Sequence, residues 1–249
     1  MKTFALVTGA SRGLGEALAC ELIDRGIALA TVARHDNPLL QERSDATGVA
    51  VSQLRADLAD PAAAQQAALD LASSIPADTE RCLLINNAGT VAPVANTADL
   101  TSAGTLAQAF SLNVTSLMLL CAQTLQATRG RQMDRRILNI SSGAGRSPVA
   151  GWGVYCSTKA AVDMYTRVLA QEHADLRAAS MAPGVIDTAM QADIRATDAN
   201  AFPGKQRFLD LHEQGQLAVP ATVARHIVDA LLHPDFGQTI LDDIRHHTS

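Results

Sequence analysis

Tyr155 and Lys159 are the side chains in this sequence whose types and spacing best suit proton transfer. Residues four apart lie on one face of a helix, so the phenol and the ammonium would stand side by side. A free phenol has a pKa of about 10 and is a poor base at neutral pH, but a nearby ammonium favours its ionised form. Such a pair can give a proton to a carbonyl oxygen while hydride arrives at the carbon. The alternative is a helix-surface pair without a chemical role.

A glycine-rich turn, TGASRGLG at residues 8–15, connects the first predicted strand to the first predicted helix. Glycine lets the backbone approach a pyrophosphate closely, and the helix N-terminus adds free N–H groups and a partial positive charge. A glycine pattern alone is a weak signal, but its place between a strand and a helix strengthens it. The predicted dinucleotide contacts in this turn are Gly9, Ser11, Arg12, Gly13, Leu14 and Gly15.

The end of the second predicted strand bears on which nicotinamide cofactor would bind there. A carboxylate at this place bonds the ribose 2′-hydroxyl of NAD and would repel a 2′-phosphate. Here the strand ends in Ala33 and Arg34 follows it, while Arg12 lies in the glycine-rich turn. Arginine presents a planar fork of donors that matches phosphate oxygens. We therefore predict NADP(H). Two solvated arginines, or a ribose contact from Asp36, are the alternatives.

Two further segments directly follow predicted strands, namely NNAG at 86–89 and PGVIDT at 183–188. Each alone could be an ordinary turn. In open parallel sheets, however, ligands bind at the carboxyl ends of the strands. The cofactor contacts expected in these segments are Asn87, Ala88, Gly89, Pro183, Gly184, Ile186 and Thr188.

The elements that must position these residues alternate between short apolar runs and longer helical patterns. Most runs are continuously apolar, as in strands buried on both faces of a parallel sheet. This alternation predicts one doubly wound, Rossmann-type α/β domain over residues 1–249, with a seven-stranded parallel sheet flanked by helices. The predicted strands are Phe4–Thr8, Ile27–Ala33, Val49–Leu54, Cys82–Asn86, Arg136–Ser141, Ala178–Ala182 and Thr239–Leu241, and the predicted helices are 13–25, 61–74, 105–129, 153–174 and 221–232.

One segment, at about 187–215, breaks this rhythm with a mixed polar stretch that contains Pro203 and Gly204. Long insertions in compact domains often act as lids over a site. We therefore expect a substrate lid here, with a plain pair of surface helices as the alternative.

Composition narrows the classes of partner. Hydrophobic residues make up 47% of the 249 positions and charged residues 18%, which suits a folded chain with a sizeable core. A net charge of −5 and 3% aromatic residues argue against nucleic acid. We see no apolar stretch of membrane-spanning length and no room for a signal peptide, so we expect no membrane partner and a cytoplasmic location. The four cysteines form no CxxC pair and the histidines no HExxH motif, so no metal site is expected.

The ordered set TGxxxGxG, NNAG, YxxxK and PGxxxT resembles that of the short-chain dehydrogenase/reductase family, over nearly the whole chain. The resemblance implies a nicotinamide-dependent oxidoreductase with Tyr155 as its general acid. It implies that Ser142, thirteen residues before Tyr155, bonds the substrate oxygen, and that Asn113 holds a water for proton relay to Lys159. Lys159 would also bond the nicotinamide ribose. Asp57 and Leu58 match the adenine-contacting pair of the family.

Within this family, GWGVYC at 151–156 and PGVIDTAMQ at 183–191 resemble sepiapterin reductases and bacterial benzil-reducing enzymes. This implies NADPH-driven reduction of a ketone or vicinal dicarbonyl. Trp152 would line the substrate pocket, or would only cap the entrance of its helix. Sepiapterin reductases hold the pterin with a carboxylate near the C-terminus, where Asp242 and Asp243 lie. Either one of these faces the pocket, or both end a strand at the surface.

Other functions stay open. Reduction of a 3-oxoacyl group or oxidation of an alcohol is the second hypothesis, and a nucleotide-sensing regulator without chemistry is the third. The intact set of Asn113, Ser142, Tyr155 and Lys159 argues against the third. Members of the family pair through two long helices, here 105–129 and 153–174, so a homodimer or homotetramer is expected.

Overall fold

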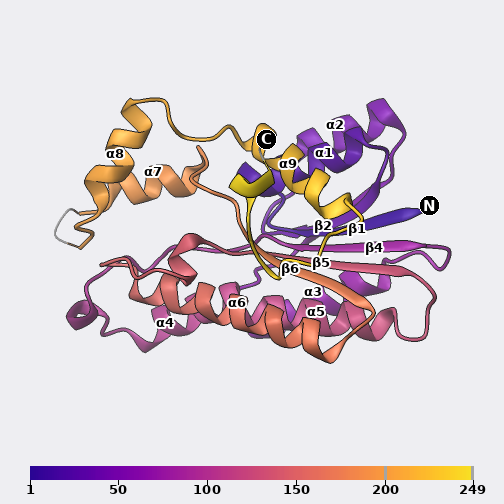
Figure 1. Cartoon of the computed structure of the whole chain (residues 1–249), viewed down its shortest axis with the longest axis horizontal. Coiled ribbons are helices and arrows are strands. Elements are labelled where there is room, and N and C mark those ends of the chain that lie inside the picture. The colour runs from indigo at the N-terminus through magenta and orange to yellow at the C-terminus, as the bar shows by residue number, and fades with distance from the viewer. Residues whose placement is uncertain (199–200, 248–249) are drawn as a thin grey trace.

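The structure is a computed structural model of the chain and describes residues 1–198 and 201–247. In this part of the chain, seven parallel strands form one sheet in the order β3-β2-β1-β4-β5-β6-β7. Helices α1, α2 and α9 cover one face of the sheet, and α3, α5 and α6 cover the other (Figure 1). The predicted fold class, a doubly wound Rossmann-type sheet, is confirmed.

The element bounds agree with most of the predicted ranges. The strands are β1 (Thr3–Thr8), β2 (Ala28–Ala33), β3 (Val51–Arg55), β4 (Arg81–Asn86), β5 (Asp134–Ile140), β6 (Leu176–Ala182) and β7 (Leu241–Asp243). The helices are α1 (Gly13–Asp24), α2 (Pro38–Thr47), α3 (Pro61–Ser73), α4 (Ala103–Phe110), α5 (Ser116–Ala127), α6 (Gly153–Glu172), α7 (Ala189–Ala196), α8 (Lys205–Glu213) and α9 (Pro220–Leu232).

Two apolar clusters explain why the strands are continuously apolar. Side chains alternate across a strand, so each central strand supplies both faces of the sheet. In β1, Ala5 and Val7 lie in the cluster under α1 and α9, whereas Phe4 and Leu6 lie in the cluster under α3, α5 and α6. Burial of both faces leaves the carboxyl edge of the sheet as the place where polar loops can gather.

Several differences from the predicted elements have clear causes. Helix α2 was not predicted, because it buries only Leu40 and therefore lacks an apolar stripe. The predicted helix at 105–129 is divided by a π-helical turn, Ser111–Thr115, between α4 and α5. The last strand was predicted at Thr239–Leu241 but runs over Leu241–Asp243, because two acidic residues hide its strand pattern.

The segment predicted to be a lid, 187–215, contains α7 and α8, and its residues 199–200 lie outside the described part of the chain. In Figure 1 the two helices stand beyond the carboxyl edge of the sheet, at the end where α6 begins. The sequence offered a lid and a pair of surface helices as alternatives. The helix pair is observed, and a lid function stays a prediction.

By length and composition alone, the helical run Ala103–Ala127 is apolar enough to cross a membrane, so the expectation that no stretch of this length is present is wrong. Part of its apolar character has a local explanation. Leu117, Leu120 and Cys121 of α5 lie in the core cluster that also contains Leu71 of α3. The inward side of this run therefore packs against the sheet and its neighbouring helix.

Exposed apolar side chains on these helices indicate where a second copy would pack, while self-association itself stays a prediction. Phe110 at the end of α4 is 40% exposed, and on α6 Met164 is 55% and Val168 39% exposed. We expect a homodimer or homotetramer in which this surface is covered by a second copy. Replacing both α6 residues (Met164→Glu with Val168→Glu) places charges in the contact and should give a folded monomer.

The measurement is light scattering at micromolar concentration, with circular dichroism to check the fold. Leu69→Glu is the control, because Leu69 of α3 is also 41% exposed but lies on another helix. A monomeric unmodified protein would contradict the expectation, as would a double variant that associates like its control.

Candidate active site

The predicted proton-transfer pair lies in the first turns of α6. Tyr155 is buried, and the Ser142 side chain hydrogen-bonds to it. Burial raises the pKa of the Tyr155 phenol, and the Ser142 hydrogen bond opposes this rise without reversing it. Ser142 Oγ also accepts a hydrogen bond from Ala144 N over 3.2 Å, which holds the hydroxyl in the turn after β5. The phenol is therefore protonated at neutral pH, which is the state that a general acid needs.

Lys159 is buried one helical turn further along α6, with Nζ 5.8 Å from the centre of the Tyr155 ring. Its Nζ donates a 2.7 Å hydrogen bond to the carbonyl oxygen of Ile140, the last residue of β5. Burial lowers the pKa of Lys159 to about 8, while the nearby carboxylate of Asp163 acts in the opposite direction. Most of the lysine is therefore an ammonium at neutral pH, and the positive charge expected beside the phenol is present.

Asn113 is buried in the π-helical turn, a type of helix distortion that is common at functional sites. Its side-chain amide makes two hydrogen bonds of 2.8 Å with the main chain of Thr90 and a third, of 3.0 Å, to Thr158 Oγ1. A Cβ built on Gly89 would lie 3.3 Å from Asn113 Oδ1 and 3.7 Å from Lys159 Nζ. The structure thus brings Asn113 and Lys159 to the same stretch of main chain after β4.

The glycine-rich turn closes tightly against that same stretch. A Cβ built on Gly15 would lie 2.1 Å from Gly9 O and 2.4 Å from Asn87 Nδ2, so no larger residue fits. Asn87 Nδ2 donates to Thr8 O over 3.0 Å, and Thr8 Oγ1 accepts hydrogen bonds of 2.9 Å from the main-chain N–H groups of Asn87 and Ala88. The ends of β1 and β4 are therefore held together by side chains of their own loops.

The segment after β6 joins this assembly. Gly13, the first residue of α1, has a φ of +63°, and a Cβ built there would lie 3.4 Å from Thr188 Cγ2. Arg12 occupies the N-cap position of α1, and its side chain makes no capping hydrogen bond. An uncapped helix N-terminus beside three converging strand-end loops fits the pyrophosphate of a dinucleotide. Of the predicted contacts in 183–188, Thr188 lies beside this helix N-terminus, and the role of the segment in cofactor binding stays a prediction.

Arg12 and Arg34, on which the prediction of NADP(H) rests, are both exposed near the carboxyl ends of β1 and β2. Arg12 lies in the glycine-rich turn and Arg34 directly follows β2, and within the described residues neither forms an ion pair. Asp36, the alternative ribose ligand, is ion-paired with Arg55. The carboxylate that was the alternative ribose ligand is therefore engaged by a neighbouring cation.

Asn37 is a positioning residue that the sequence analysis did not assign. It is buried, and its Nδ2 donates to Ala10 O over 3.2 Å and to Glu16 Oε2 over 2.6 Å. These bonds fasten the loop that carries Arg34 to the glycine-rich turn. The available signal was Asn followed by Pro38, which is a common start of a helix.

Asp57 and Leu58, the expected adenine contacts, have different surroundings. The side chain of Leu58 is buried in the core cluster under α3. Asp57 is exposed, and its Oδ1 accepts a 3.0 Å hydrogen bond from Ala59 N. Asp57 is therefore the member of the pair whose side chain faces solvent.

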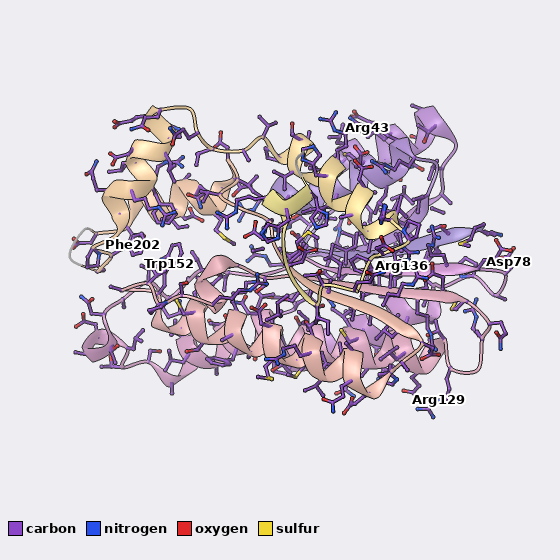
Figure 2. The ribbon with its side chains drawn as sticks, viewed as in Figure 1. Arg43, Asp78, Arg129, Arg136, Trp152 and Phe202 are labelled. Atoms are coloured by element: carbon purple, nitrogen blue, oxygen red, sulfur yellow. The ribbon has the colours of Figure 1, made fainter. Side chains whose placement is uncertain are left out.

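Trp152 links the inserted helices to the phenol. Its ring stacks on Phe202 with centroids 4.9 Å apart and meets the Tyr155 ring edge-on at 5.4 Å. Phe208 of α8 completes the contact at 5.3 Å. Figure 2 shows Trp152 and Phe202 together at one end of the molecule. Trp152 is the N-cap residue of α6 but makes no side-chain capping hydrogen bond, and a substrate contact from its ring stays a prediction.

Several buried polar atoms near the loops of the carboxyl edge have no hydrogen-bond partner within the described residues. They include Asn86 Oδ1, Ser141 Oγ, Trp152 Nε1 and Gln191 Oε1. Gln191 received no role in the sequence analysis, although its place in the first turn of α7, three residues after Thr188, was a usable signal. Unsatisfied buried polar groups are uncommon in folded proteins, so these atoms are candidates for contact with a bound molecule.

Asp242 and Asp243 are both buried in β7, so the expectation that both end a strand at the surface is wrong. Asp242 Oδ2 lies 2.8 Å from His247 Nε2. Asp243 accepts hydrogen bonds from Arg245 Nε over 2.8 Å and Nη2 over 2.6 Å. Both carboxylates hold the C-terminal turn Ile244–His247, and a substrate contact from either stays a prediction.

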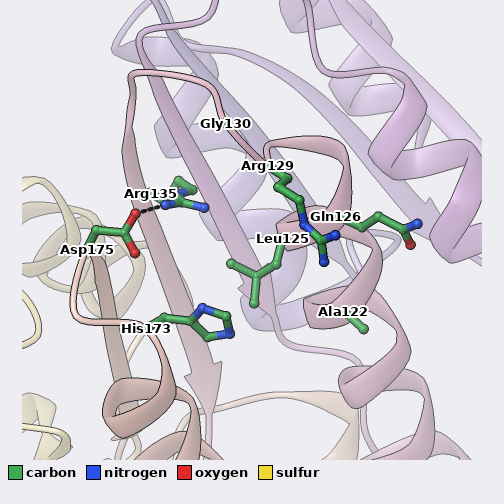
Figure 3. A pocket seen from close by; sticks show the side chains of 8 residues that line it. All are labelled: Ala122, Leu125, Gln126, Arg129, Gly130, Arg135, His173 and Asp175. Atoms are coloured by element: carbon green, nitrogen blue, oxygen red, sulfur yellow. Dashed lines mark hydrogen bonds and ion pairs between the residues drawn. The ribbon is translucent and has the colours of Figure 1, made fainter.

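A cavity of about 530 Å³ lies between the C-terminal end of α5, the start of β5 and the loop after α6 (Figure 3). Arg135 and Asp175 form an ion pair in its wall, and Leu125 and His173 also line it. These residues lie at the amino ends of β5 and β6, away from Tyr155. Because such sheets bind ligands at the carboxyl ends of their strands, we do not assign this cavity to cofactor or substrate.

Comparison with known proteins agrees with this geometry. The chain matches the short chain dehydrogenase family over residues 3–199. It is 35% identical to the benzil reductase ((S)-benzoin forming) of Bacillus cereus, over 94% of this chain and 96% of that protein. It is also 35% identical to the sepiapterin reductase of Rattus norvegicus, over 93% of this chain and 92% of that one.

Solved structures are similar over nearly the whole chain. The KRED1-Pglu enzyme has a TM-score of 0.82 and 30% identity, over 95% of this chain and 99% of that one. A short-chain dehydrogenase from Sphingobium yanoikuyae in complex with NADPH has a TM-score of 0.77 and 25% identity, over 99% of this chain and 89% of that one.

The tight packing of the glycine-rich turn gives a direct test. The change Gly15→Ala forces a Cβ into main-chain atoms, so it should weaken cofactor binding at least about tenfold and lower the stability of the fold by about 1–3 kcal/mol. Gly104→Ala is the matched control, because a Cβ on Gly104 of α4 meets nothing within 4 Å. Fluorescence titration with NADPH and thermal unfolding measure both effects. Unchanged binding in Gly15→Ala would show that the turn is not the cofactor cradle.

Proposed function

The chain belongs to the short chain dehydrogenase family of oxidoreductases, and we propose that it uses NADPH to reduce a ketone or vicinal dicarbonyl to the alcohol, with Tyr155 as the general acid. The observation that carries this proposal is the convergence of four residues at one edge of the sheet. Tyr155 bonds to Ser142, and Lys159 and Asn113 meet beside Gly89. A Tyr155–Lys159 pair at the helix surface, without a chemical role, would not need these partners.

When bound, the reduced nicotinamide supplies the hydride. Tyr155 donates its proton to the carbonyl oxygen as negative charge develops there, because burial keeps the phenol protonated. Ser142 presents its hydroxyl beside the phenol and holds the same oxygen in place. The two hydroxyls thus form a small donor pair for an oxyanion.

Lys159 stabilises the tyrosinate that remains after proton transfer, because its ammonium lies beside the ring in a water-poor site. Hydrogen bonds with Thr90 and Thr158 fix the side chain of Asn113, and this residue would hold a water for proton relay. Such a water would return a proton towards Lys159. The role of each residue follows the expectation from the family resemblance.

NADPH is proposed over NADH on the charges around the end of β2. Ala33 brings no carboxylate, Arg34 and Arg12 are exposed cations, and Asp36 is paired with Arg55. A 2′-phosphate would meet two arginine donors at this place, while Asp36 is engaged by Arg55. The structural relative in complex with NADPH is consistent with this preference.

An aromatic ketone or dicarbonyl is the favoured substrate class. The benzil reductase and the sepiapterin reductase among the relatives are named for two such compounds. In this chain, Trp152 and its aromatic neighbours lie directly beside Tyr155, and a flat apolar ring would pack well against them. Reduction of a 3-oxoacyl group and oxidation of an alcohol are the competing reactions.

A panel assay of NADPH oxidation distinguishes these reactions. The substrates are benzil, sepiapterin, a simple aliphatic ketone and a 3-oxoacyl thioester, each at equal concentration. The proposal expects the highest kcat/KM for the first two. Preference for the thioester, or turnover only in the direction of alcohol oxidation, would favour the competing reactions.

Removing the phenolic hydroxyl tests the assignment of the acid. Tyr155→Phe should keep the fold and NADPH binding but lose about 100- to 10,000-fold in kcat, because general acid catalysis contributes about that much. Tyr165→Phe is the matched control, since Tyr165 lies on the same helix and is the other tyrosine of the chain. Equal turnover of the two variants would refute the role of Tyr155.

Charge reversal tests the cofactor preference. The unmodified protein should favour NADPH roughly ten- to hundredfold in kcat/KM, and Arg34→Asp should reverse the order, because it removes a phosphate partner and adds a ribose acceptor. Arg225→Asp, at an exposed site on α9, controls for the change in net charge. If NADH served equally well before the change, or the ratio did not move after it, Asp36 would be the next residue to test.

A further inference from the structure

A buried carboxylate lies one helical turn beyond Lys159. Tyr155, Lys159 and Asp163 are spaced four residues apart on α6 and therefore share one face of the helix. Asp163 is 5% exposed, and its charge acts on Lys159 against the effect of burial. The phenol, the ammonium and this carboxylate thus form a row along the inner face of α6.

Two partners hold the Asp163 carboxylate. Arg146 Nε donates to Oδ2 over 2.9 Å, and Ser180 Oγ donates to Oδ1 over 2.5 Å. The arginine is itself fixed, because Nη1 donates to the carbonyl oxygen of Asp242 over 2.9 Å and Nη2 to that of Ser180 over 3.1 Å. The ion pair is therefore anchored to the ends of β6 and β7 and cannot turn away from α6 freely.

Gly145 brings the arginine to this place. A Cβ built on Gly145 would lie 2.8 Å from the carbonyl carbon and 3.0 Å from the carbonyl oxygen of Lys159. The turn Gly143–Gly145 can therefore pack directly on the main chain of α6. Arg146 directly follows this turn, and its side chain extends to the Asp163 carboxylate.

The charged and titratable groups around Lys159 are few among the described residues. Tyr155 and Asp163 face it from its own helix, and Arg146, in the turn after β5, is the ion-pair partner of Asp163. From β7, Asp242 turns its carboxylate to His247 and offers only its carbonyl to Arg146. The charge next to the ammonium is therefore that of Asp163, and Arg146 can act on it through its ion pair with this carboxylate.

We propose that Asp163 and Arg146 are positioning residues that together set the charge state of Lys159, the carboxylate favouring the ammonium and the guanidinium limiting that effect. The proposal rests on the role of Lys159 in the proposed reaction, but it concerns the lysine in the protein without substrate. Because the ion pair is neutral as a whole, loss of either half leaves an uncompensated charge of opposite sign near Lys159. Asp163→Asn should lower the pKa of Lys159, and Arg146→Gln should raise it.

Lysine NMR measures this directly, because Lys2, Lys159 and Lys205 are the three lysines of the sequence. The pH titration of ¹⁵N-lysine-labelled protein, without cofactor or substrate, should place Lys159 near pH 8. The Asp163→Asn midpoint should fall by about one pH unit and the Arg146→Gln midpoint should rise. Glu172→Gln is the control, since it removes an exposed negative charge from the far end of the same helix and should leave the midpoint unchanged.

A purely structural role would disturb both variants in the same direction, so opposite shifts are the decisive result. Shifts of the same sign, or an unchanged midpoint in Asp163→Asn, would overturn the proposal. In the active enzyme, the alkaline limb of the kcat/KM profile should move with the NMR midpoint. If the midpoints shift as expected but this limb does not follow, the proposed role of Lys159 in the reaction fails while its electrostatic control by the ion pair stands.

Discussion

The main chain that follows β4 is the constraint on which both halves of the site depend. Asn87 bonds to the end of β1 and fills the space beside Gly15, which fixes the glycine-rich turn at the start of α1. A few residues later, Thr90 holds the amide of Asn113, and Gly89 leaves room for the lysine of α6. Nucleotide binding and proton transfer are therefore aligned by one short loop. A Cβ at Gly15 would collide with Gly9, and a Cβ at Gly89 would crowd the amide of Asn113.

Burial acts on the two chemical groups of α6 in a complementary way. It raises the pKa of Tyr155 and lowers that of Lys159, so both groups are shifted towards their neutral forms. The hydrogen bond from Ser142 and the carboxylate of Asp163 each oppose that shift. The site thus keeps the phenol able to donate a proton and the lysine mostly charged near neutral pH. The YxxxK spacing alone does not set either state. Tyr155 depends on Ser142 in the turn after β5, and Lys159 depends on Asp163, one helical turn further along α6.

How much of this arrangement could be predicted from the sequence follows from the range of each interaction. β1 and the glycine-rich turn were predicted, because continuous apolar burial and a strand–turn–helix order are written in consecutive residues. Helix α2 was missed because it buries one leucine, and the π-helical turn around Asn113 was missed because its composition does not differ from that of an α-helix. The partners of Asp242 and the ion pair at Asp163 join residues 5 and 17 positions apart, which no local pattern specifies.

The inserted helices depend on the same edge of the sheet for their packing. Gly151 has a φ of +82°, and a Cβ there would lie 2.4 Å from Ala201 O, so the insertion meets the main chain at the start of α6 without an intervening side chain. Phe202 is fully buried and stacks on Trp152, whose ring touches the phenol of Tyr155. The space next to the phenol is therefore bounded by rings from both the central domain and the insertion. Because aromatic rings pack best against flat apolar partners, the shape of this boundary can discriminate substrates while the proton-transfer groups beneath it stay unchanged. In the proposed function, substrate range and chemistry would thus be carried by different parts of the chain that meet at Trp152.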